Sequence, residues 1–273
     1  MRIAARRLGL YWAASLAVAS AGLGQQTGPT TREYPTPTIR EEQRVVVDGI
    51  PETWRLEWAA APAVKPACDA SDAGSWTCPC MGFAYGESGD LYLTRIRDGV
   101  EVDRLHLTPL FGNERNQVAT VQRWPVYDLD FDNQGSPRLA DDVSQRPAVR
   151  VMHFADYDHD GHATEFYMET ESGPCGKNTG VVVGVSSDNP KLHALGTASH
   201  PDAPLYLHKM EWEALRAATA AVEVEDWACG DHGSPTETKD ELYWTGRGIE
   251  GVRREYSCPA AGESRSLLDQ KPL

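Results

Sequence analysis

Long apolar runs are nearly absent from this chain. One such run lies within residues 1–25, behind a basic start, and no other stretch approaches the roughly 18 apolar residues of a spanning helix. The basic start, the apolar run and the small residues Ala19 and Ala21 are typical of a secretory signal peptide. The sequence therefore predicts a signal peptide over residues 1–25, a secreted or periplasmic mature chain, and no transmembrane segment in that mature chain.

Positive charge is also scarce. The chain has 26 Lys and Arg against 40 Asp and Glu, which gives a formal net charge of -14 at pH 7. Nucleic acids and anionic membrane surfaces attract proteins through basic patches, so this balance argues against both as partners. An acidic chain suits divalent cations instead.

Cysteines are few but even in number, at positions 68, 78, 80, 175, 229 and 258. An even set of cysteines in an exported chain indicates disulfides, although the sequence leaves many pairings open. The order along the chain favours one bond from Cys68 to Cys78 or Cys80. It also favours a bond between Cys229 and Cys258.

Helix-forming stretches are rare, and short runs rich in β-branched and aromatic residues dominate residues 45–258. These runs predict a single, mainly β domain of antiparallel strands, compatible with a propeller or a sandwich and stapled by disulfides. Within it, Asp98-Gly99 separates two strand-like runs, which is typical of a type I′ hairpin turn. Residues 209–222 are rich in Ala, Leu, Glu and Met and predict a helix that Trp212 packs onto the sheet.

Two terminal segments contain little that a core could bury. Residues 26–44 are rich in Thr, Pro and charge, and residues 259–273 are similarly polar. Such compositions do not bury enough apolar surface to offset the conformational entropy lost on folding. We therefore expect a disordered linker over residues 26–44 and a flexible tail over residues 259–273.

The most specific chemistry lies in the stretch FADYDHDGHATEF, residues 154–166. Asp156, Asp158 and Asp160 stand at loop positions one, three and five, a spacing that aims several oxygens at one calcium ion. Gly161 at position six permits a sharp reversal of the chain. Three carboxylates this close repel one another unless a cation neutralises them, which favours a metal site over a plain acidic turn.

The second half of the loop would complete the coordination. His162 would offer its backbone carbonyl, and Thr164 and Glu165 follow at positions nine and ten. Position twelve is Tyr167 instead of a bidentate glutamate, and the flanking runs alternate like strands, so the loop is not an EF-hand. The sequence predicts a calcium site formed by Asp156, Asp158, Asp160, His162, Thr164 and Glu165.

The loop resembles the calcium loops of FG-GAP and VCBS repeats, which join strands in β-propellers of the integrin kind and follow the pattern D-x-D-x-D-G-x-x-D. A departure from that pattern is Thr164, where these repeats usually have Asp. The resemblance extends over residues 124–168, because the stretch LDFDNQGSPRL repeats the spacing of the first loop. Its Asp130, Asp132 and Gln134 are expected to form a second, weaker calcium site, since an amide replaces one carboxylate.

Other residue clusters suggest different metals. His159 and His162 have the spacing H-x-x-H and could bind zinc, although the oxygen-rich loop favours a hard ion. Cys78, Cys80 and Met81 could bind Cu(I) as soft ligands. Disulfide bonding in an oxidising compartment explains the same thiols without a metal.

A possible catalytic pair lies in the last quarter of the chain. Asp231 and His232 stand between two glycines beside Cys229 and are weak candidates for acid/base chemistry. No G-x-S-x-G nucleophile motif accompanies them. A turn in which the aspartate bonds its own backbone explains the same residues equally well.

These features together predict a secreted, calcium-stabilised binding or scaffold protein of the bacterial envelope or exterior, as the resemblance to FG-GAP and VCBS repeats implies. Its ligand would be a protein or a carbohydrate. The rival hypothesis is a secreted hydrolase that uses the Asp231 and His232 loop. The sequence identifies no catalytic residue firmly, so it favours a role without enzymatic activity, with calcium as the cofactor.

Overall fold

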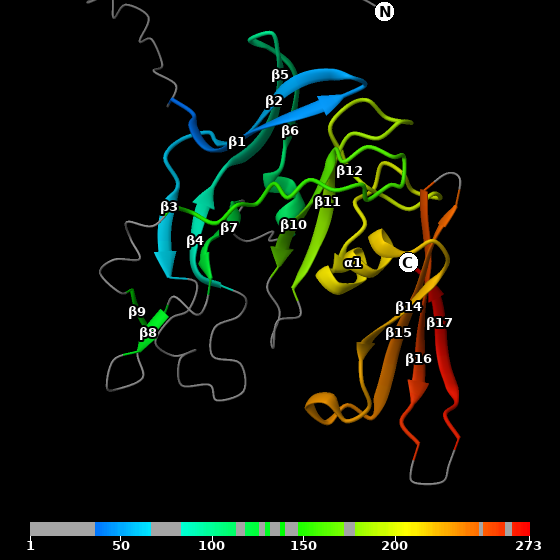
Figure 1. Ribbon diagram of the computed structural model, residues 1–273. Helices are drawn as coiled ribbons and strands as arrows, with labels where there is room; N and C mark the ends of the chain where they lie inside the picture. The colour runs from blue at the N-terminus through cyan, green and yellow to red at the C-terminus, as the bar shows by residue number, and fades with distance from the viewer. Residues whose placement is uncertain are drawn as a thin grey trace, which may run out of the picture. The chain divides into compact units, whose positions relative to one another are not determined.

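A computed structural model of the protein describes residues 36–66, 83–112, 118–125, 129–131, 137–139, 147–171, 178–245, 248–259 and 264–273. Over these ranges the chain has seventeen strands and one α-helix, α1 (Lys209–Ala217), and all strand ladders are antiparallel (Figure 1). The mainly β prediction is confirmed. The described strands form separate sheets, and these sheets do not close into a propeller.

The first sheet consists of β1 (Thr38–Val47), β2 (Ile50–Trp58), β5 (Leu91–Arg97) and β6 (Val100–His106). Its strand order is β1–β2–β5–β6, and the hairpins β1–β2 and β5–β6 each turn on an Asp-Gly pair. The φ angles are 52° and 76° at Asp48-Gly49 and 51° and 78° at Asp98-Gly99. Positive φ at both residues is what a type I′ turn requires, so the predicted hairpin at Asp98-Gly99 is confirmed.

Two smaller sheets follow along the chain. One consists of β3 (Ala63–Pro66), β4 (Phe83–Gly89) and β7 (Ala119–Pro125), and the other of β8 (Leu129–Phe131) and β9 (Pro137–Leu139). The 3-10 turn η2 (Thr108–Phe111) connects β6 toward β7. Beyond β9, the segment 147–153 runs beside β7, because the Val149 N–H donates to the Arg123 carbonyl at 2.9 Å.

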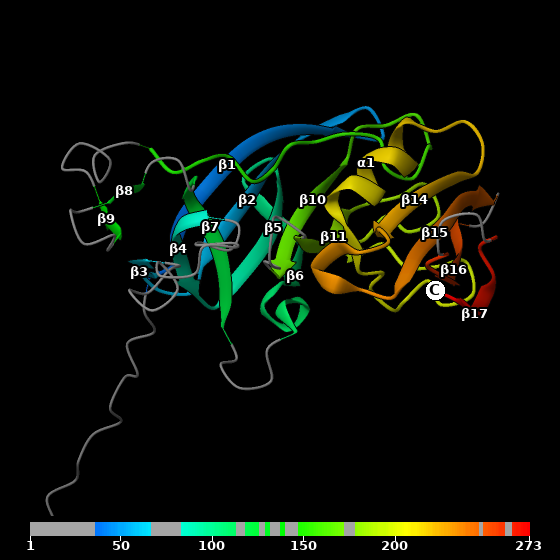
Figure 2. The same cartoon turned by 90° about the horizontal axis from the view of Figure 1, so that it is seen from below.

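The last two sheets contain the residues of most interest. One consists of β10 (Glu165–Glu171), β11 (Thr179–Gly184), β12 (His193–Ala194) and β13 (Leu207–His208), and the other of β14 (Val222–Trp227), β15 (Thr236–Thr245), β16 (Gly248–Ser257) and β17 (Leu267–Pro272). In Figure 1 the strands β14 to β17 lie side by side in orange and red. The helix α1 contacts strands of both sheets (Figure 2).

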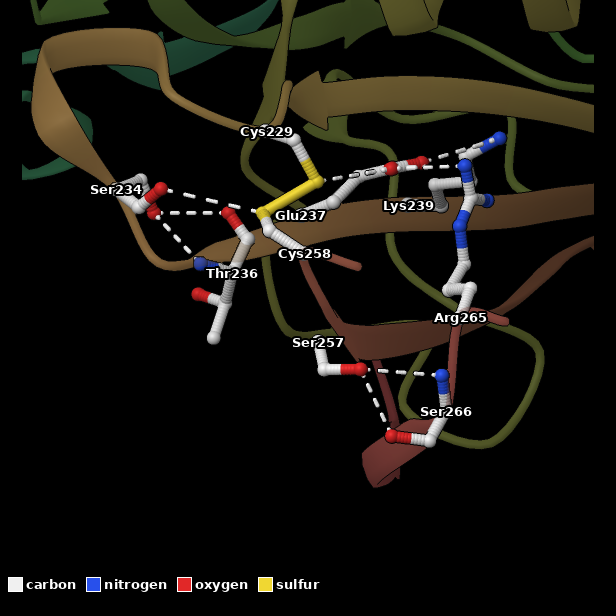
Figure 3. The surroundings of a disulfide bond; sticks show 9 residues. All are labelled: Cys229, Ser234, Thr236, Glu237, Lys239, Ser257, Cys258, Arg265 and Ser266. Carbon is white, nitrogen blue, oxygen red and sulfur yellow. Dashed lines mark hydrogen bonds and ion pairs between the residues drawn. A yellow bond between two sulfur atoms is a disulfide. The ribbon is translucent and has the colours of Figure 1, made fainter. Parts of the chain in front are cut away.

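A disulfide joins the turn after β14 to the end of β16. Cys229 and Cys258 are bonded with their Cα atoms 5.4 Å apart (Figure 3), which confirms this predicted pairing. Beside the bond, the carboxylate of Glu237 pairs with Lys239 at 3.3 Å and with Arg265 at 2.9 Å. The other four cysteines, and the Cu(I) ligands considered with them, lie outside the described residues.

Two buried apolar clusters hold the sheets together. The first packs Trp54, Leu56 and Trp58 of β2 against residues of β5, β7, β10 and β11. The second packs α1 onto β11, β15 and β16, with Trp212 and Leu215 buried in it. Trp212 also donates its indole N–H to the Gly180 carbonyl at 3.1 Å, so it anchors the helix to the sheet as predicted.

The predicted boundaries of the linker, helix and tail need correction. Strand β1 begins at Thr38, inside the expected linker, because its polar side chains pair across the sheet edge: Arg40 bonds Glu87 at 3.0 Å. Strand β17 lies in the expected tail, where backbone pairing with β16 holds side chains that are all exposed. The helix expected over 209–222 ends at Ala217, since the alternation V-E-V-E-D-W from Val222 suits a strand paired with β15.

Buried charges help to dock α1. Glu211 and Asp240 are fully buried, and Arg253 donates to the Asp240 carboxylate at 2.8 Å. His208 contacts Asp226 at 2.8 Å, and its backbone N–H donates to the Glu211 carboxylate at 2.7 Å. Three carboxylates thus face one guanidinium and one imidazole. Burial, and next the hydrogen bond with Asp240, raises the pKa of Glu211, because a proton there removes the excess negative charge. Asp226 raises the pKa of His208.

Replacing Glu211 by Gln should flatten the dependence of stability on pH. The pKa of Glu211 is raised above 4.5 in the folded protein, so its contribution to the free energy of unfolding is lost as pH rises above that value. We expect the wild type to lose up to about 1.4 kcal/mol per pH unit relative to Glu211→Gln within this window. Urea unfolding of both proteins without metal, between about pH 5 and pH 8, measures the difference.

The matched control is Glu225→Gln, which changes an exposed glutamate of β14. It should follow the wild-type curve, because the side chain of Glu225 is exposed and lies outside the buried cluster around Glu211. Parallel curves for the wild type and Glu211→Gln would contradict the account of the α1 cluster.

Candidate metal centre

The acidic loop is closed at its base by backbone bonds between Ala155 and Glu165. The Ala155 N–H donates to the Glu165 carbonyl at 2.8 Å, and the Glu165 N–H donates back at 3.3 Å. Inside the loop, His159 and Gly161 have positive φ angles of 60° and 89°. Glycine is suited to this backbone conformation, so Gly161 plays the turning role that its position predicts. The loop therefore leads directly into β10 through Glu165.

Three carboxylates of this loop converge. One oxygen from each of Asp156, Asp158 and Glu165 lies within 4.8 Å of the others. Glu165 is fully buried, whereas both aspartates are half-buried. Such a group could hold a metal ion, because it gathers hard oxygen ligands at one point.

Most of the carboxylate oxygens also accept local hydrogen bonds. Asp156 Oδ2 accepts from the Gly161 N–H at 3.0 Å, and Asp158 Oδ1 accepts from the Asp160 N–H at 3.1 Å. Glu165 Oε2 accepts from the Tyr157 N–H at 2.9 Å. Asp156 Oδ1 differs, because it is buried and has no hydrogen-bond partner among the described residues. A buried oxygen without a donor is energetically costly, and a cation would satisfy it.

Burial and mutual repulsion disfavour the charged forms of these groups. Burial first, and then the charges of Asp160 and Asp156, raise the pKa of Asp158 to about 7. Burial likewise raises the pKa of Glu165 to about 8, although hydrogen bonds from Thr164 and Tyr157 act in the opposite direction. Without a cation, the cluster therefore retains protons at pH values where ordinary carboxyl groups are ionised.

The convergence includes only half of the predicted ligands. Asp160 accepts the backbone N–H groups of His162 at 2.8 Å and Ser187 at 3.0 Å, so its carboxylate shapes the turn. The Thr164 hydroxyl donates to Glu165 Oε1 at 2.5 Å and to the Val185 carbonyl at 3.1 Å. Thr164 thus orients Glu165. The backbone carbonyl of His162, the remaining predicted ligand, is not one of the three converging groups.

The second predicted loop cannot be compared with the first. Asp130 lies in β8, but its side chain is outside the described part of the chain, as are Asp132 and Gln134 entirely. The weaker calcium site predicted there stays a prediction.

The histidines of the loop lie apart from the three carboxylates. His159 directs Nε2 at the Leu215 carbonyl, 3.2 Å away, and its ring lies 5.3 Å from that of Trp244. His162 is exposed. The metal-binding group within the described residues contains neither histidine, so the oxygen ligands of the loop remain the better candidates.

The Asp231 and His232 pair lies in a short turn. Asp231 is the first residue of the short 3-10 turn η6 (Asp231–Gly233), and its carbonyl accepts the Ser234 N–H at 2.9 Å. The side chain of His232 lies outside the described part of the structure. The turn follows from Gly230, whose φ is 80°.

The acidic loop contacts α1 through Tyr157, and no motif in the sequence predicts this contact. Tyr157 lies between two of the acidic residues, and its ring packs edge-on against Trp212 with centroids 6.2 Å apart. Its hydroxyl donates to Glu213 Oε1 at 3.2 Å. Spacing alone could not reveal this contact, because it depends on how α1 packs more than 50 positions later along the chain.

Comparison with known proteins identifies no relative of this chain. The chain matches no protein-family model, no curated protein and no solved structure. The resemblance of the loop to FG-GAP and VCBS repeats therefore rests on the residues themselves. Among the described residues, no helix is long and apolar enough to cross a membrane.

Replacing Thr164 by Val tests how Glu165 is positioned. The substitution keeps the shape of a buried side chain but removes the donor to Glu165 Oε1 and to the Val185 carbonyl. We expect the free energy of unfolding to fall by about 1–3 kcal/mol, since both acceptors lose a buried partner. The control Thr38→Val changes an exposed threonine at the start of β1 and should unfold at nearly the wild-type urea concentration. Equal midpoints for all three proteins would refute the role assigned to Thr164.

Proposed function

We propose that the protein is a secreted, calcium-stabilised binding or scaffold protein whose metal ion is held by Asp156, Asp158 and Glu165. The observation that carries the proposal is the convergence of these three carboxylates around a buried Asp156 oxygen that has no partner among the described residues. Calcium is bound in proteins by six to eight oxygens, and three carboxylates contribute up to six of them.

The chemistry of the ligand set supports calcium over softer metals. The three converging side chains offer only carboxylate oxygens, without thiolate or imidazole. Zinc and copper favour nitrogen and sulfur ligands, whereas calcium and magnesium favour oxygen. The loop also supplies ligands from close positions in the sequence, and calcium tolerates such irregular geometry better than magnesium does.

The proposed role of the ion is structural. Glu165 begins β10, and the next residue, Phe166, is fully buried in the first apolar cluster. Tyr157 lies within the same loop and contacts Trp212 and Glu213 of α1. An ion bound by the three carboxylates would neutralise their repulsion. It would thereby hold the start of β10 in place, and also Tyr157 where it contacts α1.

Export and a binding role are parts of the same proposal. The disulfide Cys229–Cys258 supports an oxidising compartment, in agreement with the signal peptide predicted over residues 1–25. A calcium-stabilised loop outside the cytosol supports a binding or scaffold role. The general partner is a protein or a carbohydrate.

Thermal unfolding with and without calcium tests this proposal. A ligand that binds only the folded state raises the midpoint by mass action, by about 2.7 kcal/mol at 100 times the dissociation constant. For a domain of this size that corresponds to a rise of about 5 °C in millimolar calcium relative to EDTA. Asp158→Asn should abolish the rise without lowering the midpoint in EDTA, because it removes a ligand and a repelling charge together.

The control variant is Asp202→Asn, which changes an exposed aspartate in a turn and should keep the full calcium response. Parallel titrations with magnesium and zinc identify the preferred ion. The proposal fails if calcium leaves the wild-type midpoint unchanged, or if Asp158→Asn responds as strongly as the wild type does.

A further inference from the structure

A second site candidate is a pocket beside α1. Its volume is about 490 Å³, which lies in the range of small-molecule sites. Five parts of the chain form its walls: β7, the segment 149–153, the acidic loop, β10 and the first turns of α1. These walls include Tyr157, so the pocket adjoins the acidic loop without containing any of its three converging carboxylates.

The pocket has a cationic rim, defined as Arg150 and Lys209, and His153 also lines the pocket. No hydrogen bond or ion pair is found for the side chains of Lys209 and His153 within the described structure. The Arg150 side chain is 63% exposed, and its nearest carboxylate oxygen, on Glu41, is 4.0 Å away. That carboxylate already accepts the Val151 N–H at 2.7 Å. Lys209 is therefore available to meet a ligand, and the ion pair that Arg150 makes with Glu41 is long.

The two carboxylates of the pocket are already engaged. Glu213 pairs with Arg216 at 2.6 Å and accepts the Tyr157 hydroxyl. Glu169 accepts the Asn178 side-chain amide at 2.9 Å. Arg216 offsets the charge of Glu213, and the neutral amide of Asn178 stabilises the carboxylate of Glu169 by a hydrogen bond. The formal charges that line the pocket therefore balance, two cations against two carboxylates, in a chain whose net charge is -14.

Several cations elsewhere in the described structure are paired with carboxylates. Arg40, Arg95 and Arg253, for example, each pair with a buried carboxylate at hydrogen-bond distance. An acidic protein has carboxylates in excess, so most cations find partners easily. A cation without a carboxylate partner at the edge of a pocket can form a charge-assisted hydrogen bond with an anionic ligand.

The floor of the pocket is apolar. Val121 and Met168 are buried residues that line it, together with Val151 and the ring of Tyr167. An inorganic anion would leave such a floor uncovered, whereas an organic ligand would bury it. Glu169 and Glu213 would repel a ligand that carries several negative charges. The ligand that suits both features has one anionic group and an apolar body.

We propose that this pocket binds a small organic carboxylate, with its anionic group at the cationic rim and its apolar body on the floor. The inference rests on the binding role proposed above and adds a small-molecule ligand to the protein or carbohydrate partner proposed there. It does not require the metal ion, because the rim and the floor lie outside the three converging carboxylates.

Calorimetric titration with three matched probes tests the assignment. Benzoate, benzamide and benzylamine share one apolar ring and differ in charge. Benzoate should bind saturably at millimolar or lower concentration and at least tenfold more tightly than benzamide, since a charge-assisted hydrogen bond exceeds a neutral one. Benzylamine should not bind. Lys209→Gln and Arg150→Gln should each weaken benzoate binding several-fold, whereas Lys191→Gln, which changes an exposed lysine outside the pocket, should not.

The outcomes separate this proposal from that of the metal site. Titrations run in calcium and in EDTA should both give saturable benzoate binding, while the calcium response of the midpoint is read independently. Benzoate binding together with an unfolding midpoint that calcium does not change would uphold the pocket and overturn the metal site. A clear calcium response without benzoate binding would do the reverse. Equal affinity for benzoate and benzamide, or unchanged affinity in Lys209→Gln and Arg150→Gln, would overturn the cationic rim.

Discussion

The repulsion among Asp156, Asp158 and Glu165 is the constraint on which the account of this protein depends. The loop gathers these carboxylates within 4.8 Å, and one of them begins a strand whose next residue belongs to the apolar core. Like charges at this distance must be protonated or neutralised by a cation. The backbone bonds across Ala155 and Glu165 hold the loop closed, so the repulsion cannot be relieved by separating its ends. A bound calcium ion would resolve the conflict.

The helix α1 connects this constraint to the rest of the fold. Its inner face is fixed by Trp212 and by the buried cluster around Glu211, while Glu213 on another face meets Tyr157 of the acidic loop. Lys209 and Glu213 also border the pocket. One short helix is therefore shared by an acidic loop, a proton-sensitive cluster and a candidate ligand site. The position of the helix depends on both groups of buried carboxylates.

Local patterns in the sequence predicted local structure well. Asp98-Gly99 identified a hairpin because two positive φ angles need such a pair, and the proximity of Cys229 and Cys258 along the chain favoured their bond. Features that depend on distant partners were missed. Strand β17 has only exposed side chains, so its composition resembled a tail, and the roles of Asp160 and Thr164 follow from contacts with Ser187 and Val185. The pocket unites segments that no single motif connects.

The most direct test is a crystal structure of the protein grown in calcium, with the ion identified by its anomalous scattering. The account predicts one ion coordinated by Asp156 Oδ1, Asp158 and Glu165, with oxygen distances of about 2.3–2.6 Å. The central claim would be contradicted by electron density for only a water molecule at this position, or by no density there. The carboxylates would then share protons instead of a cation.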